Sequence, residues 1–345
     1  MAEMTSVERV RCVLEHREPD RVPHFEWLID RHVREALCPG CRSHNEFAVR
    51  FGHDAVLVGP DFAKTPLGPD RWRSEWGYVA QKTAEEHGIE VESPISSMAD
   101  FERYQPPATD QPGRYASIEA VVREFKGSKA IGVHLNDVFS LPRYLMGMEG
   151  LLTAVAAEPD LVRALVEMSV DVNLELAKAA AARGADFIWT GDDYAYNAGP
   201  LVSPPQFREL FYPGLCRAIG GFRALGLPVI KHTDGNLWPI LDLILDSGIN
   251  CLDPIDPQAG MDLATVKAKY GQRVALKGNV DCATVLASGT PEQVVEATRQ
   301  ALRAGAPGGG FILSSSNSIH SGVRPENYLA MLQTWERYRA YPVRA

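Results

Sequence analysis

The residues with the clearest chemical potential are His232 and Asp234, in the stretch 231–236 (Lys-His-Thr-Asp-Gly-Asn). The stretch follows the apolar run 227–230, which predicts a short buried strand. Alternate side chains of an extended chain point the same way, so the imidazole and the carboxylate face one side together. At a strand end, such a pair suits divalent-metal binding or acid/base chemistry. The structural alternative is a turn in which the histidine is solvated and the aspartate caps the next helix.

Composition places the chain among large globular proteins. It has 345 residues, of which 45% are hydrophobic and 23% charged. That is enough for two domains, or for one barrel of roughly 250 residues with insertions. The net charge of -9, without a long basic run, argues against nucleic-acid binding. There is no apolar run of about 18 residues, and the polar opening 1–9 does not have the pattern of a signal peptide. We therefore expect a cytoplasmic protein that does not enter membranes.

Six cysteines are spread along the chain, at positions 12, 38, 41, 216, 251 and 282. This distribution predicts free thiols in a reducing compartment. Cys38-Pro39-Gly40-Cys41 resembles half of a zinc knuckle, but no second pair follows at metal-binding spacing. We therefore expect a turn with two free thiols at this position, rather than a structural zinc ion.

Short β-rich runs alternate with helical segments along most of the chain. The runs lack polar/apolar alternation, which indicates strands buried on both faces and hence a parallel sheet. Eight such units predict an α/β fold of the (β/α)8 TIM-barrel type, with residues 1–345 forming one domain. An N-terminal helix is expected at 6–16. The expected strands are 22–27, 54–60, 130–135, 186–190, 227–230, 250–254, 274–278 and 310–314.

The region after the second expected strand interrupts this alternation. Between residues 62 and 113, Trp72, Trp76 and Tyr78 alternate with polar residues, and a proline-rich return follows. This pattern predicts a β-hairpin insertion in the barrel. The insertion would be either a lid over the site or a dimer contact, so the sequence leaves monomer and homodimer open.

Polar residues follow every expected strand, at the end where TIM barrels place their active sites. Several carboxylates around one histidine need a cation, or one of them must hold a proton. Covalent acyl transfer is disfavoured, because there is no Gly-x-Ser-x-Gly motif and no cysteine at an expected strand end. We expect an acid-rich pocket for a small-molecule substrate, formed by Glu26, Asp61, Asn136, Asp137, Asp192, Asp193, His232, Asp234, Asp253, Asn279, Asn317 and His320.

Several short motifs together have a more specific meaning. They are Arg9 with 19–23 (Pro-Asp-Arg-Val-Pro), 278–281 (Gly-Asn-Val-Asp) followed by 289–292 (Gly-Thr-Pro-Glu), and 309–313 (Gly-Gly-Phe-Ile-Leu) followed by 324–327 (Arg-Pro-Glu-Asn). With them the chain resembles the uroporphyrinogen decarboxylase superfamily over nearly its full length. The resemblance implies a TIM barrel, in agreement with the number of expected strands.

The branch of that superfamily that decarboxylates uroporphyrinogen carries arginines after the first strand, which bind the substrate's carboxylates. The corresponding residues here, 25–31 (Phe-Glu-Trp-Leu-Ile-Asp-Arg), are mainly apolar and acidic. By the same resemblance, the essential aspartate corresponds to Asp61. The late histidine of that branch falls at Asn317, which cannot exchange a proton as an imidazole does. These departures argue against uroporphyrinogen as the substrate.

The other branch consists of methyltransferases that act with corrinoids, including those that use coenzyme M. The resemblance implies a zinc site made of a His-x-Cys pair and a later cysteine. The pair aligns with His232 and Asp234, and the later cysteine with Asn317. Without sulfur, the site would suit zinc or another divalent metal through harder ligands. Methyl transfer from a methoxylated or methylated-amine substrate to a corrinoid on a partner protein is compatible with such a site.

These observations lead to three hypotheses. The first is a methyltransferase-like enzyme with a divalent metal, zinc in the first instance, bound at His232 and Asp234 as a Lewis acid. The second is a cofactor-free decarboxylase or lyase that acts on a small carboxylic acid, with Asp61 orienting the substrate and His232 shuttling protons. The third is a binding protein that has lost its chemistry. The expected catalytic residues are Asp61, Asp192, Asp193 and His232, and the expected substrate-binding residues are Glu26, Asn136, Tyr194, Asn279, Asn317 and His320.

Overall fold

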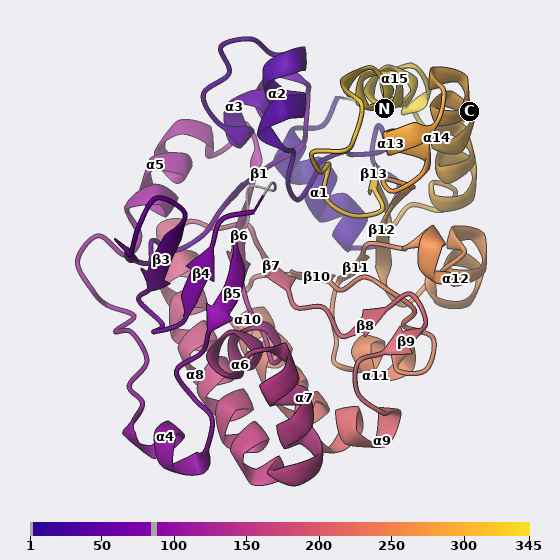
Figure 1. Ribbon diagram of the computed structural model, residues 1–345. Helices are drawn as coiled ribbons and strands as arrows, with labels where there is room; N and C mark the ends of the chain where they lie inside the picture. The colour runs from indigo at the N-terminus through magenta and orange to yellow at the C-terminus, as the bar shows by residue number, and fades with distance from the viewer. Residues whose placement is uncertain (1–2, 84–87) are drawn as a thin grey trace.

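A curled parallel sheet surrounded by helices organises the computed structural model (Figure 1). The structure describes residues 3–83 and 88–345; the start of the polar opening and part of the expected insertion, residues 1–2 and 84–87, lie outside it. Every neighbouring pair of strands in this sheet is parallel. In the described residues the sheet has seven strands, in the order β1 (Ala55–Val58), β6 (Ala130–Leu135), β7 (Phe187–Gly191), β10 (Val229–His232), β11 (Cys251–Asp253), β12 (Ala275–Val280) and β13 (Phe311–Ser315).

The expected first strand, residues 22–27, does not form a ladder, and this corrects the prediction of eight strands. The segment lies between β13 and β1 and closes the barrel through isolated bonds. The amide of Leu313 donates to the carbonyl of Pro23 over 3.0 Å, and the amide of Asp54 donates to the carbonyl of His24 over 2.8 Å. Pro23 has no amide hydrogen, so a regular ladder would lack one of its donors at this point. The result is a TIM-barrel-like fold in which the segment 22–27 fills the position of the first strand without forming a regular ladder.

Helices cover the outside of the sheet, and their ends follow the sequence signals. The break expected at residues 158–160 is present, because one helix ends at Ala157 and the next begins at Pro159. The helices are α1 (Ser6–Leu14), α2 (Arg31–Leu37), α3 (His44–Arg50), α4 (Met98–Arg103), α5 (Ala116–Phe125), α6 (Ser140–Met146), α7 (Met148–Ala157), α8 (Pro159–Arg183), α9 (Pro204–Gln206), α10 (Tyr212–Ala224), α11 (Leu241–Asp246), α12 (Leu263–Tyr270), α13 (Val285–Ser288), α14 (Pro291–Gly305) and α15 (Pro325–Tyr338). A π-helical turn, Phe207–Phe211, joins α9 to α10. None of the described helices is long and apolar enough to cross a lipid bilayer.

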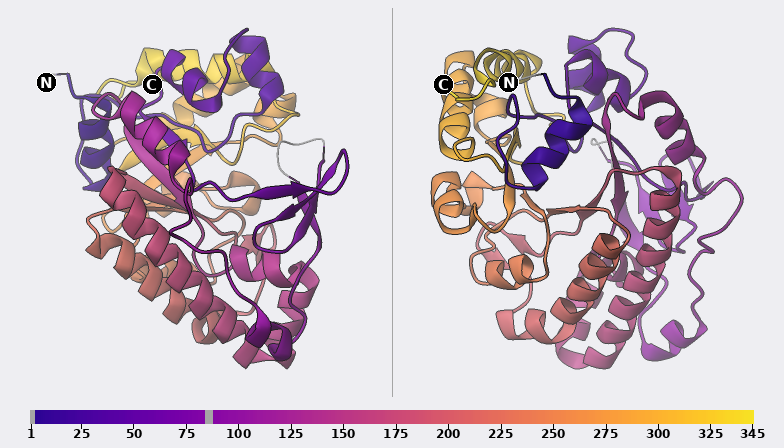
Figure 2. Two further views of the ribbon diagram at one scale, coloured as in Figure 1. Left: turned by 90° about the vertical axis from the view of Figure 1, so that its left-hand side faces the viewer. Right: turned by 180° about the vertical axis from the view of Figure 1, so that it is seen from behind.

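The N-terminal helix α1 plugs one end of the barrel. Its residues Val10, Val13 and Leu14 belong to the same buried cluster as the inward-facing Trp189 of β7 and Ile312 of β13. In the right-hand view of Figure 2, α1 crosses the end of the barrel that faces the viewer. Because this end is filled by apolar packing, the opposite end, where the strands finish, is left for polar residues.

The region 62–113, where a β-hairpin was expected, holds a four-stranded antiparallel sheet. Its strands are β2 (Lys64–Pro66), β3 (Arg71–Ser74), β4 (Val79–Gln81) and β5 (Ile89–Glu92), paired in sequence order. The left-hand view of Figure 2 shows this sheet projecting from one side of the barrel. A second small ribbon, β8 (Ala195–Tyr196) with β9 (Gly199–Pro200), follows β7.

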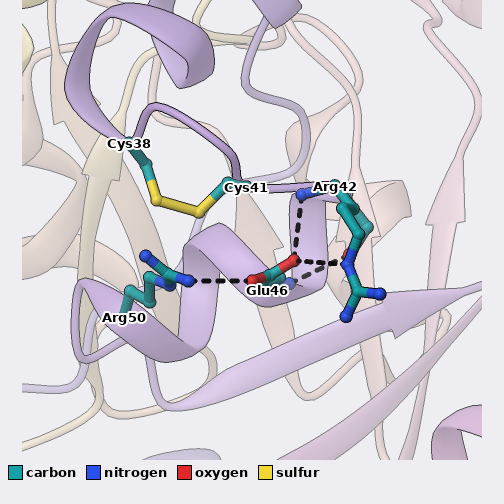
Figure 3. Close-up of a disulfide and its surroundings, with 6 residues drawn as sticks. Cys38, Cys41, Arg42, Glu46 and Arg50 are labelled. Carbon is teal, nitrogen blue, oxygen red and sulfur yellow. Dashed lines mark hydrogen bonds and ion pairs between the residues drawn. A yellow bond between two sulfur atoms is a disulfide. The ribbon is translucent and has the colours of Figure 1, made fainter.

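Cys38 and Cys41 are joined in a disulfide, which corrects the prediction of two free thiols (Figure 3). The Pro39-Gly40 turn makes the pairing possible, since Gly40 has a φ of 87° and the two Cα atoms are 5.5 Å apart. The remaining cysteines, at positions 12, 216, 251 and 282, are free.

Candidate metal centre

Three side chains at the carboxyl ends of β7 and β10 form a candidate metal site. One donor atom each from Asp193, His232 and Asp234 lies within 4.8 Å of the other two. His232 is the last residue of β10 and is 6% exposed, whereas the side chain of Asp193 is 51% exposed. The site therefore has a buried imidazole and an opening to solvent. The alternation of side chains predicted that His232 and Asp234 face one side, and the structure adds Asp193 to them.

A chain of buried contacts fixes the imidazole of His232. Its Nδ1 lies 2.8 Å from Oδ2 of Asp253, and the other oxygen of Asp253 lies 2.8 Å from Nζ of Lys277. Lys277 also donates to Oγ of Ser314 over 2.9 Å. Burial opposes ionisation of Asp253, but Lys277 and His232 outweigh it and lower the pKa of this carboxyl group. Since Asp253 is a carboxylate, Nδ1 of His232 carries the proton and donates it, which leaves Nε2 facing Asp193 at 3.7 Å.

The charges around His232 favour a bound cation. Burial disfavours its charged form, yet the hydrogen bond and charge of Asp253, with Asp193 and Asp234, raise the pKa of His232. Burial and the charge of Asp193 raise the pKa of Asp234. A carboxyl group and an imidazole that both hold protons more tightly than usual indicate excess negative charge. A divalent cation balances this charge directly and displaces the protons.

Asn317 is hydrogen-bonded to Asp234, at the edge of the cluster. Its Nδ2 donates to Oδ2 of Asp234, and its Oδ1 accepts from the amide of Ser318 over 2.7 Å. Each end of the amide thus makes one hydrogen bond. The position that the family resemblance assigned to a later metal ligand therefore serves to orient the carboxylate of Asp234.

Asp192, predicted as a catalytic acid or ligand, is held by backbone amides and is not one of the three clustered side chains. Its Oδ2 accepts from the amides of Asp137, Phe139 and Ser140 over 3.1, 2.7 and 3.0 Å, at the start of α6. The side chain is fully buried, and burial together with Asp137 raises its pKa. Its role in the structure is to anchor the loop that leads into α6.

Tyr194, predicted to bind substrate, lies in a second buried network behind the cluster. Its hydroxyl donates to Oδ1 of Asp137, whose other oxygen lies 2.9 Å from Nζ of Lys231. The Lys231 ammonium also sits 4.1 Å from the centre of the Tyr194 ring. Tyr194 is 1% exposed, so it is part of the buried packing behind the cluster.

Glu26 lies inside the barrel, next to the end of β13. Its Oε1 accepts from the amide of Ser315 over 3.0 Å, and its Oε2 accepts from the Ser315 hydroxyl over 2.7 Å. The residue is 1% exposed, and this burial raises its pKa to about 7, although Lys277 opposes the shift. The folded protein therefore holds a proton on Glu26 at pH values where the unfolded chain has lost it.

A pH-dependent loss of stability follows from Glu26. The pKa rises from 4.5 to about 7 on folding, so its stabilising effect is present below pH 4.5 and is lost as the pH rises through about 7. Over that window, we expect the wild type to lose about 3 kcal/mol of unfolding free energy relative to Glu26→Gln. Urea unfolding at several pH values measures the difference. The exposed Glu124→Gln variant should track the wild type, and a Glu26→Gln curve parallel to it would contradict the assignment.

The remaining predicted residues occupy other places on the rim. Asp61 accepts from the Ser117 amide and hydroxyl over 2.9 and 2.6 Å, so both its oxygens hold the start of α5. His320 is likewise held by backbone groups, with Nε2 3.2 Å from the Cys282 carbonyl. Asn136 lines a cavity beside β6, and Asn279 is half-buried in β12, opposite Ser314.

The residues expected to form the site did not include the two buried lysines, Lys231 and Lys277, or the aromatic neighbour Trp27. The ring of Trp27 stacks against His232 with centroids 6.1 Å apart. A signal for the lysines was present, because each lies within an apolar strand, where an unpaired charge is very costly. That signal predicts a buried carboxylate partner but does not identify which one.

The match to a family model decides the identity of this barrel. The model of the family described as uroporphyrinogen decarboxylase (URO-D) matches residues 79–338, most of the chain. The chain belongs to the uroporphyrinogen decarboxylase family. The resemblance inferred from short motifs is thereby confirmed.

Relatives in the URO-D family carry two kinds of name. The chain is 28% identical over 297 residues to uroporphyrinogen decarboxylase of Pelobacter propionicus, covering 83% of this chain and 81% of the relative. It is 26% identical over 257 residues to that of Psychromonas ingrahamii, with 71% and 70% covered. It is 24% identical over 222 residues to methylated-thiol–coenzyme M methyltransferase of Methanosarcina mazei, with 63% and 56% covered.

A solved structure shares the fold of this URO-D family chain. It is a methyltransferase from Methanosarcina mazei, with a TM-score of 0.77 and 20% sequence identity, covering 97% of this chain and 99% of that one. At this level of identity the likeness establishes a common architecture. The function has to be argued from the site.

Proposed function

We propose that this chain is a methyltransferase that moves a methyl group between a small methylated substrate and a corrinoid carried by a partner protein, with a divalent metal at the site. The observation that carries the proposal is the cluster of Asp193, His232 and Asp234 with Nε2 of His232 facing its carboxylates. One imidazole and two carboxylates fit zinc and related divalent ions. The name of the Methanosarcina mazei relative, which acts on methylated thiols and coenzyme M, agrees with this reaction class.

The protein's part in this chemistry is to hold and orient the ligands. A divalent ion bound here would act as a Lewis acid on the heteroatom that carries the methyl group. Asp253 keeps His232 in the tautomer that offers Nε2, and Asn317 fixes the direction of Asp234. Asp193, exposed at the rim, leaves the site open on the side from which substrate and partner would approach.

Uroporphyrinogen fits the candidate metal centre poorly, because the cluster itself carries two carboxylates and the cations nearest to it are paired. In the segment that should bind its carboxylates, Arg31 lies at the start of α2, is 74% exposed, and pairs with Glu35 over 2.6 Å. The buried cations are already neutralised, Lys231 by Asp137 and Lys277 by Asp253. A substrate with many carboxylates would therefore meet the carboxylates of Asp193 and Asp234 without counter-charge from these residues.

A cofactor-free decarboxylase or lyase that acts on a small carboxylic acid is the second candidate. Its support is the name of the two relatives that cover most of the chain. In this reaction His232, held by Asp253, would return a proton to the carbon that loses carbon dioxide. A metal would not be required.

One experiment separates the two candidates. The purified protein is analysed for metal and then incubated with methoxylated or methylamine substrates and chemically reduced cob(I)alamin. We expect about one divalent ion per chain, and we expect formation of methylcobalamin, followed by its absorbance, that stops when the metal is removed by a chelator. Failure to bind any divalent ion after loading, or absence of methylcobalamin with both classes of substrate, would overturn the proposal.

A further inference from the structure

A cavity of about 640 Å³ lies between helix α15 and the loops that lead into β1 and β6. Its wall includes Gly52, shortly before β1, and Lys129, which directly precedes β6. The cavity is thus at the amino ends of these strands, whereas the candidate metal centre lies at the carboxyl ends of β7 and β10. Because the strands of the barrel are parallel, the two sites lie at opposite ends of the fold. We call this cavity the basic pocket.

The charged side chains around the basic pocket are mainly cationic, although the chain as a whole carries a net charge of -9. One acidic residue, Glu336, lines it. The cationic residues that line it come from segments far apart in the sequence and are Arg21, Arg50, Lys129, Arg337 and Arg339. Positive charge that gathers in one hollow of an acidic protein indicates a site for an anion.

Two of these cations have no counter-ion within the part of the chain that the structure describes. No carboxylate there lies within ion-pair distance of Lys129 or Arg337. The Lys129 ammonium donates to the carbonyl of His53 over 2.5 Å, and the Arg337 guanidinium lies 5.3 Å from the centre of the Tyr338 ring. Since an ammonium has three donors and a guanidinium five, both groups keep donors available to a ligand.

The other three cations differ in how firmly they are held. Arg21 donates to the fully buried Asp54 over 2.9 and 3.0 Å, so its position is fixed. Arg50 and Arg339 each pair with a glutamate three or four residues earlier in the chain, at the surface. Surface ion pairs contribute about 1 kcal/mol or less, so a more highly charged ligand can replace these glutamates.

The electrostatics of the pocket show an excess of positive charge. Burial and the charges of Arg21 and Arg9 lower the pKa of Lys129. Burial and the charges of Arg9 and Arg339 likewise lower the pKa of Arg21. Asp54 opposes both shifts but does not cancel them. Two cations that hold their protons less tightly than usual would both be stabilised by an anion in the pocket.

Apolar side chains complete the lining of the basic pocket. Arg21 and Arg339 lie against the ring of Trp335, at 5.3 and 4.7 Å from its centre. Arg21 is recessed, with its side chain 17% exposed, so a flat anionic surface would not reach it. The apolar residues of the lining are Phe51, Leu329, Leu332 and Trp335. A hollow with both cations and apolar surface suits a small organic molecule that carries negative charge.

We propose that the basic pocket binds a small organic molecule with two or more phosphoryl groups, of the class of the nucleoside diphosphates. Its phosphoryl oxygens accept from Lys129 and Arg337, and from the arginines that exchange their glutamate partners. Guanidinium groups match the geometry of phosphoryl oxygens and stay charged at neutral pH. The organic part of the ligand covers the apolar lining. This site lies at the end of the barrel away from the metal centre and does not depend on the proposed function.

Titration calorimetry with the full chain in excess EDTA tests the proposal. The chelator removes divalent ions, so a phosphorylated probe cannot be held through a metal at the candidate centre. We expect ADP and inorganic pyrophosphate to bind, and we expect no measurable binding of adenosine, which lacks the charge, or of sulfate, which has one tetrahedral group. Absence of ADP binding, or binding of adenosine or sulfate as tight as that of ADP, would overturn the proposal.

Variants of the pocket locate the binding. Arg337→Glu should weaken the affinity for ADP by about tenfold, because an attraction becomes a repulsion. Lys129→Met removes the recessed charge and should also weaken it. The matched control is Arg208→Glu, an exposed arginine of the π-helical turn that does not line the pocket and changes the net charge equally. Equal affinities of Arg337→Glu and Arg208→Glu would overturn the assignment.

A last comparison separates the basic pocket from the candidate metal centre. His232→Ala should bind ADP as the wild type does, because the lining of the pocket does not include the metal ligands. Arg337→Glu should in turn bind a divalent metal as the wild type does. Loss of ADP binding in His232→Ala would place the phosphoryl groups at the metal centre and overturn the proposal.

Discussion

Replacing Lys277 with methionine is expected to lower the unfolding free energy by about 3–5 kcal/mol. The Lys277 ammonium lies 2.8 Å from Asp253, and the two side chains are 2% and 1% exposed. Methionine has a similar length but no charge, so the variant keeps most of the packing and removes the counter-charge. Asp253 then remains as a buried carboxylate balanced only by His232. Protonating or solvating it in the folded protein lowers the free energy of unfolding.

Urea denaturation at neutral pH measures this effect. The control is Lys126→Met, which breaks a surface pair with Asp186 in which the lysine is 45% exposed, and should cost less than about 1 kcal/mol. The double variant Lys277→Met/Asp253→Leu should recover much of the loss, since it removes both buried charges. Equal costs for the two single variants would mean that Lys277 does not compensate a buried charge.

Replacing His232 with alanine is expected to weaken metal binding by at least about 100-fold, beyond the effect typical of an outer-shell partner. His232 supplies the nitrogen donor of the cluster, and its position is fixed by Asp253. Without it, Asp193 and Asp234 would have to hold the ion with two carboxylates, one of them half-exposed. Because the imidazole lies at the end of a strand, the truncation should leave the barrel intact.

Competition with a chromophoric chelator measures the metal affinity of each variant. The exposed His32→Ala variant serves as the control, because it removes a histidine of α2 outside the cluster and should bind metal as the wild type does. Retention of wild-type affinity by His232→Ala would place any bound ion elsewhere. Loss of affinity in both variants would indicate adventitious binding to surface histidines.

The architecture was largely predictable, because buried parallel strands and their helices leave local patterns. The irregular first strand was not predictable, because residues 22–27 have the composition of a strand although Pro23 interrupts the ladder. The disulfide was missed although Pro39 and Gly40 form the turn that brings Cys38 and Cys41 together. In both places the local preference, for a strand or for a turn, was identified correctly. Whether it led to a regular ladder or to a disulfide depended on the geometry of the folded chain.

The candidate site shows more clearly which features the sequence determines and which depend on the tertiary structure. Because side chains alternate along an extended chain, the sequence determined by itself that His232 and Asp234 share a side. It could not determine that Asp193 joins them while its neighbour Asp192 turns inward to hold α6, since that depends on where β7 ends. Pairings such as Lys277 with Asp253, or Asn317 with Asp234, join separate strands and loops. Only the tertiary structure decides them, because the register of neighbouring strands sets which side chains meet across the barrel.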